Sequence, residues 1–449
     1  MEKDLTKGSI FGNVVRFSLP FLCSYFLQTL YGMADLFIIG IYEDAAGTTA
    51  VSIGSQVMHM LTVMIVGLSM GTTVCVGQAV GGGDKKRARS GIGCTVTVFA
   101  ALSVVLTVVL LLCVSPIVSV MSTPAEAVDG TRAYLIVCFI GIPFITAYNI
   151  ISSIFRGLGD SKTPMIFILI ACIANISLDF LFMGAFGMGA VGAALGTTLS
   201  QALSVVISLV SVFRKKTDVM PSVHDLKPEK SVTLDILKTG IPIACQDGLI
   251  QVAFIVITVI ANKRGLTDAA AVGIVEKIIG FLFLVPSSLL STVSALCAQN
   301  IGAKKYDRAD KTLGYAILIA VSFGLVVSVT MQFFAGNAVS LFQKDPAVIA
   351  AGDGYLRGYV WDCVFAGIHF SFSGWFCARG KSYISFIQNI TAIALVRIPV
   401  VWLMSVKFTD TLFPMGLATA AGSLLSVIIC IIAFTLIKKR ENVKKVQTA

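Results

Sequence analysis

The fifth apolar segment of the chain contains two side chains that could bind a cation. In the stretch CIANISLDFLFMG, residues 172–184, Asn175 and Asp179 stand four residues apart and therefore share one face of a helix. The rest of this stretch is suited to lipid or to a dry helix interface, where an unpaired charge is costly and rarely tolerated. A carboxylate kept at such a position indicates a functional site.

A second carboxylate, Asp35, lies in the first apolar segment, one helical turn after Tyr31. Thr197 adds a hydroxyl group inside the sixth segment, in GAALGTTLSQ. Two carboxylates, an amide carbonyl and a hydroxyl are hard oxygen ligands, which can hold Na⁺ or keep a carboxylate protonated until its surroundings change. The sequence therefore predicts a cation-coupling site, or a Na⁺ site, made from Asp35, Asn175, Asp179 and Thr197. The alternative is that the two acids mark poorly placed helix ends.

Several other polar residues inside apolar segments are weaker candidates for contact with a substrate or an ion. They are Glu276, Asp247, Asp362, Arg397 and His59. Glu276 is adjacent to Lys277, so the two side chains point to different faces of a helix and cannot simply pair with each other. Asp247, Asp362 and Arg397 could instead form an inter-helix salt bridge. His59 could be a satisfied polar residue, with a proton-relay role as its alternative.

The composition places these residues in a membrane protein. Of the 449 residues, 56% are hydrophobic and only 13% are charged, whereas soluble domains carry about 25% charged residues. Apolar runs of about 20 residues recur along the whole chain, and they are continuous rather than alternating, which indicates helices and not a β-barrel. The eleven cysteines are scattered through these runs without a CxxC motif, so we expect buried thiols rather than a metal or disulfide framework. The first segment lacks a cleavage site and is expected to be retained.

Twelve transmembrane helices are predicted from these runs, separated by turn sequences such as GGGD at 81–84 and KDP at 344–346. The predicted spans are 14–40, 48–78, 92–120, 132–155, 165–185, 189–213, 238–261, 269–300, 312–341, 354–378, 384–406 and 414–437.

The basic residues indicate the orientation of these spans. Of the 34 Lys and Arg residues, 26 fall on the side that holds both ends of the chain and the segment 214–238, and six fall on the other side. Because cytoplasmic loops of membrane proteins are enriched in Lys and Arg, both termini are predicted to be cytoplasmic, in the cell inner (cytoplasmic) membrane. The net charge of +10 is therefore a topology signal, and no nucleic-acid partner is expected.

The two halves of the chain resemble each other. The segment QAVGGGDKKRAR from Gln78 matches QNIGAKKYDRAD from Gln299 at an offset of 221. Two further pairs have similar offsets: Pro20 with Pro242, and Arg156-Gly157 with Arg379-Gly380. Each half then contains six spans, and an even number means that both halves enter the membrane in the same sense. We therefore expect an N-terminal lobe, 1–213, a cytoplasmic linker, 214–237, and a C-terminal lobe with a basic tail, 238–449, around a central cavity.

The repeat also indicates that the two acids are not kept for symmetrical packing. At an offset of 222, Asp35 corresponds to Ile257, Asp179 to Val401 and Asn175 to Arg397. Because the second half lacks both acids, we expect the coupling ion to be handled by the N-terminal half alone.

The whole chain resembles the multidrug and toxic compound extrusion (MATE) family. The resemblance is carried by GLGDSKTPM at 157–165, NISLDFLF at 175–182, GMGAVGAALGT at 187–197 and the paired QAVG and QNIG segments. It implies an exporter of organic cations and other toxic compounds against an inward flow of H⁺ or Na⁺. It further implies cation-coupling roles in the N-terminal lobe for Asp35, Tyr31, Asn175, Asp179, Thr197 and Tyr134, and a helix bend at Pro20.

The expected function is therefore a secondary active antiporter with alternating access. H⁺ or Na⁺ is expected as the coupling ion, without another cofactor, and the substrate as a small amphipathic cation. The protein is expected to be a monomer among membrane lipids. The alternative is a flippase for lipid-linked saccharides, which would require cationic residues in the cavity for a pyrophosphate. An enzyme is not expected, because the three histidines, His59, His224 and His369, are far apart in the sequence and form no catalytic motif.

Overall fold

The computed structural model describes residues 4–214 and 219–448, which fold into helices with no strand in these ranges. The helices of the first half are α1 (Ile10–Tyr42), α2 (Ala45–Gly81), α3 (Lys85–Leu112), α4 (Val114–Val120), η1 (Ala125–Ala127), α5 (Val128–Ile140), α6 (Ile142–Gly157), α7 (Lys162–Asp179), η2 (Phe180–Ala185), α8 (Gly189–Arg214) and η3 (Val223–Leu226). Those of the second half are α9 (Lys230–Asn262), α10 (Leu266–Leu282), α11 (Leu284–Gly302), α12 (Tyr306–Ser340), α13 (Pro346–Tyr359), α14 (Asp362–Ala378), α15 (Ser382–Ala392), η4 (Ile393–Arg397), α16 (Ile398–Lys407) and α17 (Phe413–Thr448).

The predicted spans correspond to these helices. Within the described residues, ten helices are long and apolar enough to cross a membrane, and a pair bent by 47°, Ala125–Ile140 with Ile142–Gly157, makes an eleventh. The remaining predicted span, 354–378, is covered by the helices α13 and α14.

Several predicted spans are broken where the sequence predicted one helix. New helices begin just before Pro116 in α4, Pro143 in α6 and Pro286 in α11. Proline lacks an N–H and is tolerated in the first turn of a helix, where that donor has no partner, so each proline favours a fresh start. By contrast, Pro20 and Pro242 lie inside α1 and α9, which continue through them.

Helix α9 begins earlier in the sequence than predicted. Residues 215–218 lie outside the described residues, but the helix expected to begin at residue 238 begins at Lys230. The first turns of α9 are amphipathic rather than apolar, which hydropathy alone does not detect. Val232 and Ile236 are buried, and they pack in one cluster with residues of α2, α3 and α6.

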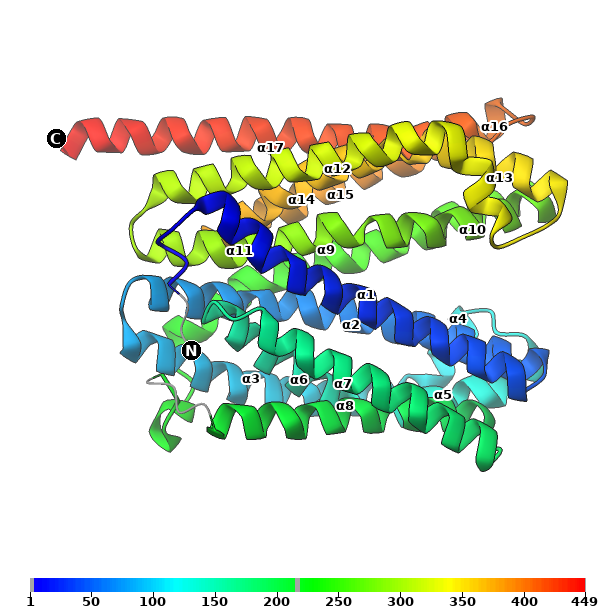
Figure 1. Ribbon diagram of the computed structural model, residues 1–449, viewed down its shortest axis with the longest axis horizontal. Coiled ribbons are helices and arrows are strands. Elements are labelled where there is room, and N and C mark those ends of the chain that lie inside the picture. Colours follow the sequence, from blue (N-terminus) through cyan, green and yellow to red (C-terminus); the bar gives the residue numbers. More distant parts are fainter. Residues whose placement is uncertain (1–3, 215–218, 449) are drawn as a thin grey trace. The chain divides into compact units, whose positions relative to one another are not determined.

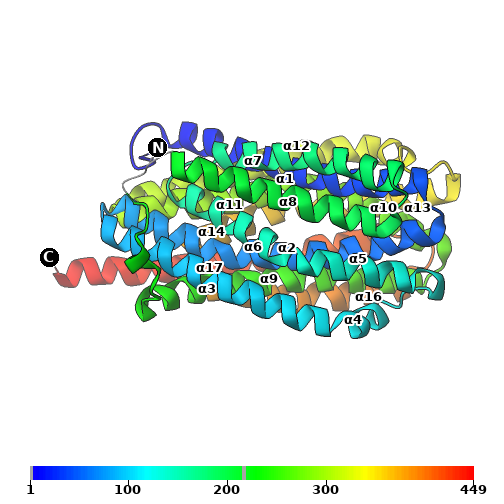
Figure 2. The same cartoon turned by 90° about the horizontal axis from the view of Figure 1, so that it is seen from below.

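The chain forms two compact units. The first contains residues 1–244 and 298–306, and the second contains 245–297 and 307–449. In the first unit α7 packs between α1 and α8, and α2 packs against α5 and α6 (Figure 1, Figure 2). In the second unit α17 packs along α13, α14, α15 and α16, and α10 packs on α13.

The matching QAVG and QNIG segments meet each other in the first unit. A β-carbon on Gly81 would stand 1.9 Å from the carbonyl oxygen of Gln299, and one on Gly302 would stand 2.0 Å from the carbonyl oxygen of Gln78. Each glycine thus makes room for the backbone of the other segment. The Gln299 side chain also accepts a hydrogen bond from the Leu5 amide (3.1 Å) and donates one to the Gly157 carbonyl (2.9 Å). The repeated motif therefore marks a reciprocal backbone contact.

Candidate functional site

Three helices of the first unit bring the predicted cation-coupling residues together. Asp35 lies in α1, Asn175 and Asp179 lie in the last turns of α7, and Thr197 lies in α8. The side chains of Asp35, Asn175 and Asp179 are buried, with exposed fractions of 2%, 1% and 0%, and Thr197 is half-buried. Because α7 packs on both α1 and α8, its last turns hold Asn175 and Asp179 against the other two helices.

Asp35 is at the centre of this group. The hydroxyl of Thr197 donates a hydrogen bond to Asp35 Oδ2 over 3.1 Å. The side chains of Asp179 and Asn175 lie next to the same carboxyl group. The other three residues that the sequence predicted for this site therefore all lie next to Asp35.

The group is rich in buried polar atoms that lack a partner. Among the described residues, none bonds Asp35 Oδ1, either carboxyl oxygen of Asp179, or either amide atom of Asn175. An ionised Asp at the centre of a membrane helix costs about 2.5–3.5 kcal/mol, and two such groups side by side also repel each other. Such a pair is stable only with protons or with a bound cation. The donor set fits Na⁺ as well as H⁺, since it offers two carboxylates, an amide oxygen and a hydroxyl.

Two local features shape the position of Asp179. A β-carbon on Gly196 in α8 would stand 2.0 Å from Asp179 Oδ1, so this glycine makes room for the carboxyl group. Directly after Asp179 the chain forms a π-helical turn, η2. Such turns occur frequently at functional sites. Neither feature was predicted from the sequence.

The two predicted tyrosines lie at the edge of the group. Tyr31 is half-buried in α1, and Tyr134 is buried in α5, where its hydroxyl and that of Ser55 are 3.1 Å apart. Both tyrosines lie within electrostatic reach of Asp35. Pro20 is buried in the same helix as Asp35, about four turns before it. The structure thus places Tyr31 and Tyr134 near the acids but not as direct partners of them.

The second unit holds a different buried polar group. Arg397, at the end of the π-helical turn η4, donates from Nη2 to Asp362 Oδ2 (2.8 Å) and to the Tyr359 hydroxyl (3.0 Å). The guanidinium group also lies over the rings of Phe254 (5.6 Å) and Tyr359 (5.9 Å). Asp362 and Arg397 are 0% and 8% exposed. The possible salt bridge that the sequence suggested for these residues is therefore formed by this pair.

The other weak candidates are not part of that ion pair. Glu276 accepts a hydrogen bond from the Thr258 hydroxyl (3.0 Å) through Oε2. Asp247 is half-buried in α9, where its carboxyl group interacts with Gln246. His59 belongs to the first unit and is exposed on α2. Glu276 lies within electrostatic reach of Arg397, whereas Asp247 and His59 show no such interaction within the described part of the chain.

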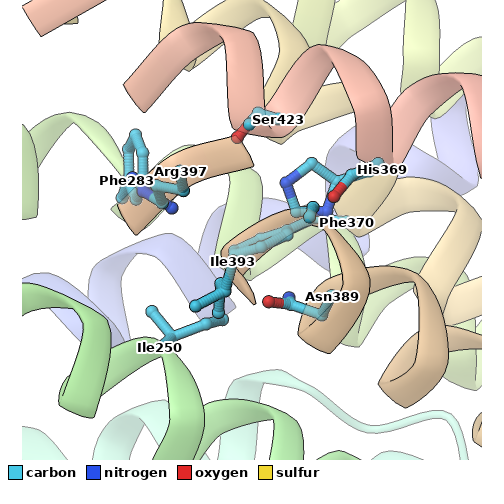
Figure 3. A pocket seen from close by; sticks show the side chains of 11 residues that line it. Ile250, Phe283, His369, Phe370, Asn389, Ile393, Arg397 and Ser423 are labelled. Carbon is cyan, nitrogen blue, oxygen red and sulfur yellow. The ribbon is translucent and has the colours of Figure 1, made fainter. Parts of the chain in front are cut away.

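A small cavity lies beside Arg397 (Figure 3). Its volume is about 20 Å³, which is enough for one water molecule. His369, Asn389, Ser423 and Ser426 supply its polar lining, and Phe283 with Phe370 supplies aromatic walls. Neither Arg397 Nε nor His369 Nδ1 has a hydrogen-bond partner in the described ranges. The cavity is too small for a drug-sized ligand.

Comparison with known proteins agrees with this architecture. A family model described as MatE matches residues 20–181 and again residues 242–403, at an offset of 222. The chain is 28% identical over 402 residues to the Probable multidrug resistance protein YpnP of Bacillus subtilis (strain 168), with 90% of each protein covered. It is 27% identical over 404 residues to the Multidrug export protein MepA of Staphylococcus aureus (strain NCTC 8325 / PS 47), covering 90% of this chain and 89% of that protein.

Solved structures show the same fold. The crystal structure of a MATE protein in the straight conformation matches with a TM-score of 0.89 at 22% identity, covering 98% of each chain. A multidrug resistance MATE family transporter of the MOP superfamily, in an outward-facing conformation, matches with a TM-score of 0.88 at 22% identity, covering 97% of each chain. The predicted fold, an all-α polytopic membrane protein of twelve transmembrane helices in two parallel six-helix repeats, is thereby confirmed, and the chain belongs to the MatE family.

Proposed function

We propose that the protein exports toxic small molecules, chiefly amphipathic organic cations, and that an inward flow of H⁺ or Na⁺ drives this export. Two curated relatives carry names that describe multidrug resistance and multidrug export. The observation that carries the proposal is the pair of buried carboxyl groups, Asp35 and Asp179, of which three oxygens lack a partner among the described residues. Such a pair of carboxyl groups is stabilised when it binds a cation and loses that stabilisation when the cation leaves.

Each residue of the group has a distinct task in this proposal. Asp35 and Asp179 supply the negative charge, and Thr197 orients Asp35 through its hydrogen bond. Asn175 offers a neutral oxygen, which suits Na⁺, or an N–H donor, which suits an ionised carboxylate. When an ion binds, the charge of the site is neutralised and the buried acids no longer require water or a counter-ion. When the ion leaves, the buried carboxylates again require water or a counter-ion.

This change of charge is the step that we couple to transport. The ion binds from outside when the carrier is open outward, and the neutral site allows α1 to bend at Pro20 and the substrate to leave. Release of the ion to the cytoplasm resets the carrier for the next substrate. The ion gradient supplies the free energy of this cycle, and ion binding shifts the balance between the two states only by as much as the ion's affinities for them differ.

The setting follows from the basic residues and the composition. We place the protein in the cytoplasmic membrane with both termini in the cytoplasm, as a monomer surrounded by lipid. The 14 methionines and 29 phenylalanines include soft, adaptable side chains that suit varied apolar cations. The transported molecule is a substrate and is not chemically changed.

Transport in proteoliposomes tests the proposal. Purified protein is reconstituted, a fluorescent organic cation is supplied, and a proton or a sodium gradient is imposed in turn. We expect one of the two gradients to stimulate transport, and the Asp35→Asn/Asp179→Asn variant to lose that stimulation. Asp129→Asn is the matched control, because Asp129 is exposed in the first turn of α5. Gradient-driven transport that persists unchanged in the double variant would contradict the proposal.

The flippase alternative has a separate test. A pyrophosphate requires free cationic groups. Away from the ends of the predicted spans, the only Lys and Arg residues are Lys277 and Arg397, and Arg397 is already engaged by Asp362 and Tyr359. We therefore expect that the gene does not rescue a strain depleted of its lipid-linked saccharide flippase. Rescue would favour the alternative.

A further inference from the structure

The surroundings of Arg397 have the form of a cation-binding site. A carboxyl oxygen of Asp362 and the hydroxyl oxygen of Tyr359 accept hydrogen bonds from the guanidinium group at 2.8 and 3.0 Å. The faces of Phe254 and Tyr359 lie within cation–π distance of the same group. Carboxylate, hydroxyl and aromatic faces are the groups that bind a free cation in a dry site. Here the cation is a side chain of the protein itself.

The internal repeat relates this position to the site of the first unit. The two family matches start at residues 20 and 242, and this offset of 222 places Arg397 at the position of Asn175. In the first unit Asn175 lies beside two carboxyl groups that lack partners for three of their oxygens among the described residues. In the second unit Arg397, the equivalent of Asn175, pairs with a different carboxyl group, that of Asp362. The two positions therefore differ in whether the cation is exchangeable or covalently attached.

Similar local features occur near the two positions, although they are not at equivalent positions of the repeat. Each fifth span has a π-helical turn, η2 directly after Asp179 and η4 ending at Arg397. Each sixth span also places a glycine against one of these side chains, but at an offset of 222 Gly196 corresponds to Ala418 and Gly422 to Ser200. A β-carbon on Gly196 would stand 2.0 Å from Asp179 Oδ1, and one on Gly422 would stand 2.8 Å from Arg397 Cβ. The two units therefore share a π-helical turn and a close glycine contact in kind, but not in register, and the side chain held there differs in charge.

We propose that Arg397 is a tethered cation, which permanently fills the ion position of the C-terminal lobe. This lobe then binds no exchangeable ion at that position, and the first unit alone sets how many ions are exchanged per substrate. The inference rests on the proposed ion coupling at Asp35 and Asp179. It adds that Asp362 is a latent second cation site, held closed by Arg397.

Truncation of Arg397 would open a site of suitable chemistry. Asp362 would keep both carboxyl oxygens, of which Oδ1 has no partner in the described residues even now. The Tyr359 hydroxyl would remain beside them, and the side chain of Ser423 lies next to Asp362. The adjoining cavity adds about 20 Å³ to the space left by the guanidinium group. This space suits Na⁺ with water, or a free guanidinium ion.

The experiment measures ion binding and transport in Arg397→Ala with the full-length purified protein. Binding of radioactive Na⁺ and release of protons are measured for the wild type and the variant. Transport by both proteins is then measured in the presence of either guanidinium or urea, each at a low, non-denaturing concentration. Urea is the neutral isostere of guanidinium, and Arg397→Lys keeps a tethered positive charge. We expect Arg397→Ala to bind one more cation than wild type, and its transport to be restored by guanidinium but not by urea. Arg397→Lys is expected to bind no additional ion.

A neutral pair keeps the inference testable if Arg397→Ala does not fold. In Asp362→Asn/Arg397→Gln both charges are removed, so we expect no additional ion and the wild-type ratio of ions to substrate. A changed ratio in this variant, or an Arg397→Ala protein that folds and binds no additional ion, would overturn the inference. If wild-type protein itself shows no ion-driven transport, the proposed function fails instead, and the two failures are therefore distinguishable.

Discussion

Gly196 lies directly against the carboxyl group of Asp179. A β-carbon at Gly196 would stand 2.0 Å from Asp179 Oδ1, which is far inside van der Waals contact. Asp179 itself is fully buried at the end of α7. The close packing of α7 and α8 at the proposed ion site therefore depends on the absence of a side chain at residue 196.

Replacing Gly196 with alanine tests this dependence. We expect Gly196→Ala to displace the Asp179 carboxyl group. We also expect it to lower the free energy of unfolding by about 1–3 kcal/mol, as overpacking of a buried contact does. Ion-driven transport should then require a higher ion concentration, measured in proteoliposomes as the gradient-dependent rate. Gly40→Ala is the matched control, because nothing lies within 4 Å of a β-carbon at Gly40. Equal ion dependence in the two variants would show that the contact does not position Asp179.

The hydroxyl of Thr197 gives a second prediction. It donates a hydrogen bond of 3.1 Å to Asp35 Oδ2, and a bond to a charged group contributes about 1.5–3 kcal/mol. We expect Thr197→Val, which keeps the shape but removes the donor, to weaken ion binding about tenfold or more, since about 1.4 kcal/mol corresponds to a factor of ten. Thr197→Ser retains the hydroxyl and should bind ions nearly as wild type does. Ion binding titrated on purified protein checks this, and a Thr197→Ser variant as weak as Thr197→Val would contradict it.

The sequence alone predicted much of this site because membrane burial makes polar residues conspicuous. Asp35, Asn175, Asp179 and Thr197 are separated by up to 162 positions, yet their chemistry and the family resemblance grouped them, and the structure brings them together. Their role in ion coupling stays a prediction. The contact of Gly196 with Asp179 was not predicted, because a glycine carries no signal of what approaches it.

The geometry of the helices was harder to predict than their number. Hydropathy located the spans, but it gave no indication of the π-helical turns η2 and η4, which depend on packing around Asp179 and Arg397. It also missed the early start of α9 at Lys230, because charged residues alternate there with the buried Val232 and Ile236. The amphipathic period of that segment was the signal that could have found it.

The reciprocal contact of the repeated glycines gives a third prediction. A β-carbon on Gly302 would stand 2.0 Å from the Gln78 carbonyl oxygen, and a backbone atom cannot move aside as a flexible side chain can. We expect Gly302→Ala to destabilise the protein by about 1–3 kcal/mol, seen as a lower midpoint of thermal unfolding in detergent. Gly314→Ala is the matched control in α12, with nothing within 4 Å of its β-carbon. A Gly302→Ala protein as stable as this control would mean that the two segments separate easily.

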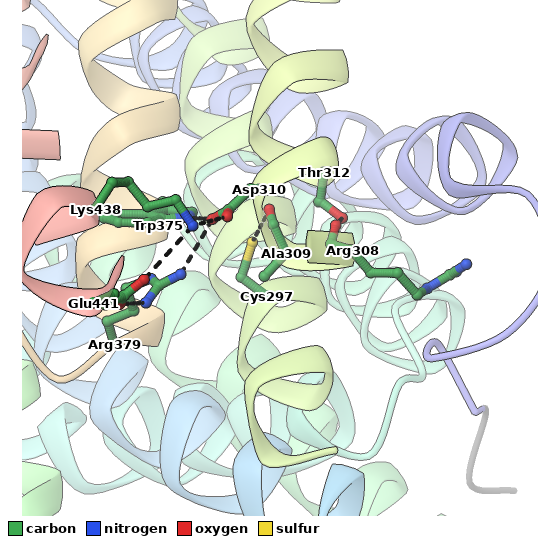
Figure 4. Close-up of polar contacts among 9 residues, drawn as sticks. All are labelled: Cys297, Arg308, Ala309, Asp310, Thr312, Trp375, Arg379, Lys438 and Glu441. Carbon is green, nitrogen blue, oxygen red and sulfur yellow. Dashed lines mark hydrogen bonds and ion pairs between the residues drawn. The ribbon is translucent and has the colours of Figure 1, made fainter. Parts of the chain in front are cut away.

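A charged network at one end of the second unit gives the last prediction (Figure 4). Asp310 of α12 accepts hydrogen bonds from Trp375 Nε1 (3.0 Å) and Arg379 Nη2 (3.1 Å), and it forms an ion pair with Lys438 of α17. Arg379 lies 4.0 Å above the Trp375 ring and also pairs with Glu441. Asp310 therefore joins three helices, whereas Glu441 joins two.

We expect Asp310→Asn to lower thermal stability more than Glu441→Gln does. The Asp310 side chain is 19% exposed and that of Glu441 is 33% exposed, so water compensates the loss less well at Asp310. We expect the free energy of unfolding to fall by about 1–3 kcal/mol in Asp310→Asn and by less than about 1 kcal/mol in Glu441→Gln. Thermal unfolding in detergent at low and high salt measures both, and high salt should reduce the difference because it screens partly exposed charges. Equal midpoints for the two variants would show that Asp310 does not hold α12, α14 and α17 together.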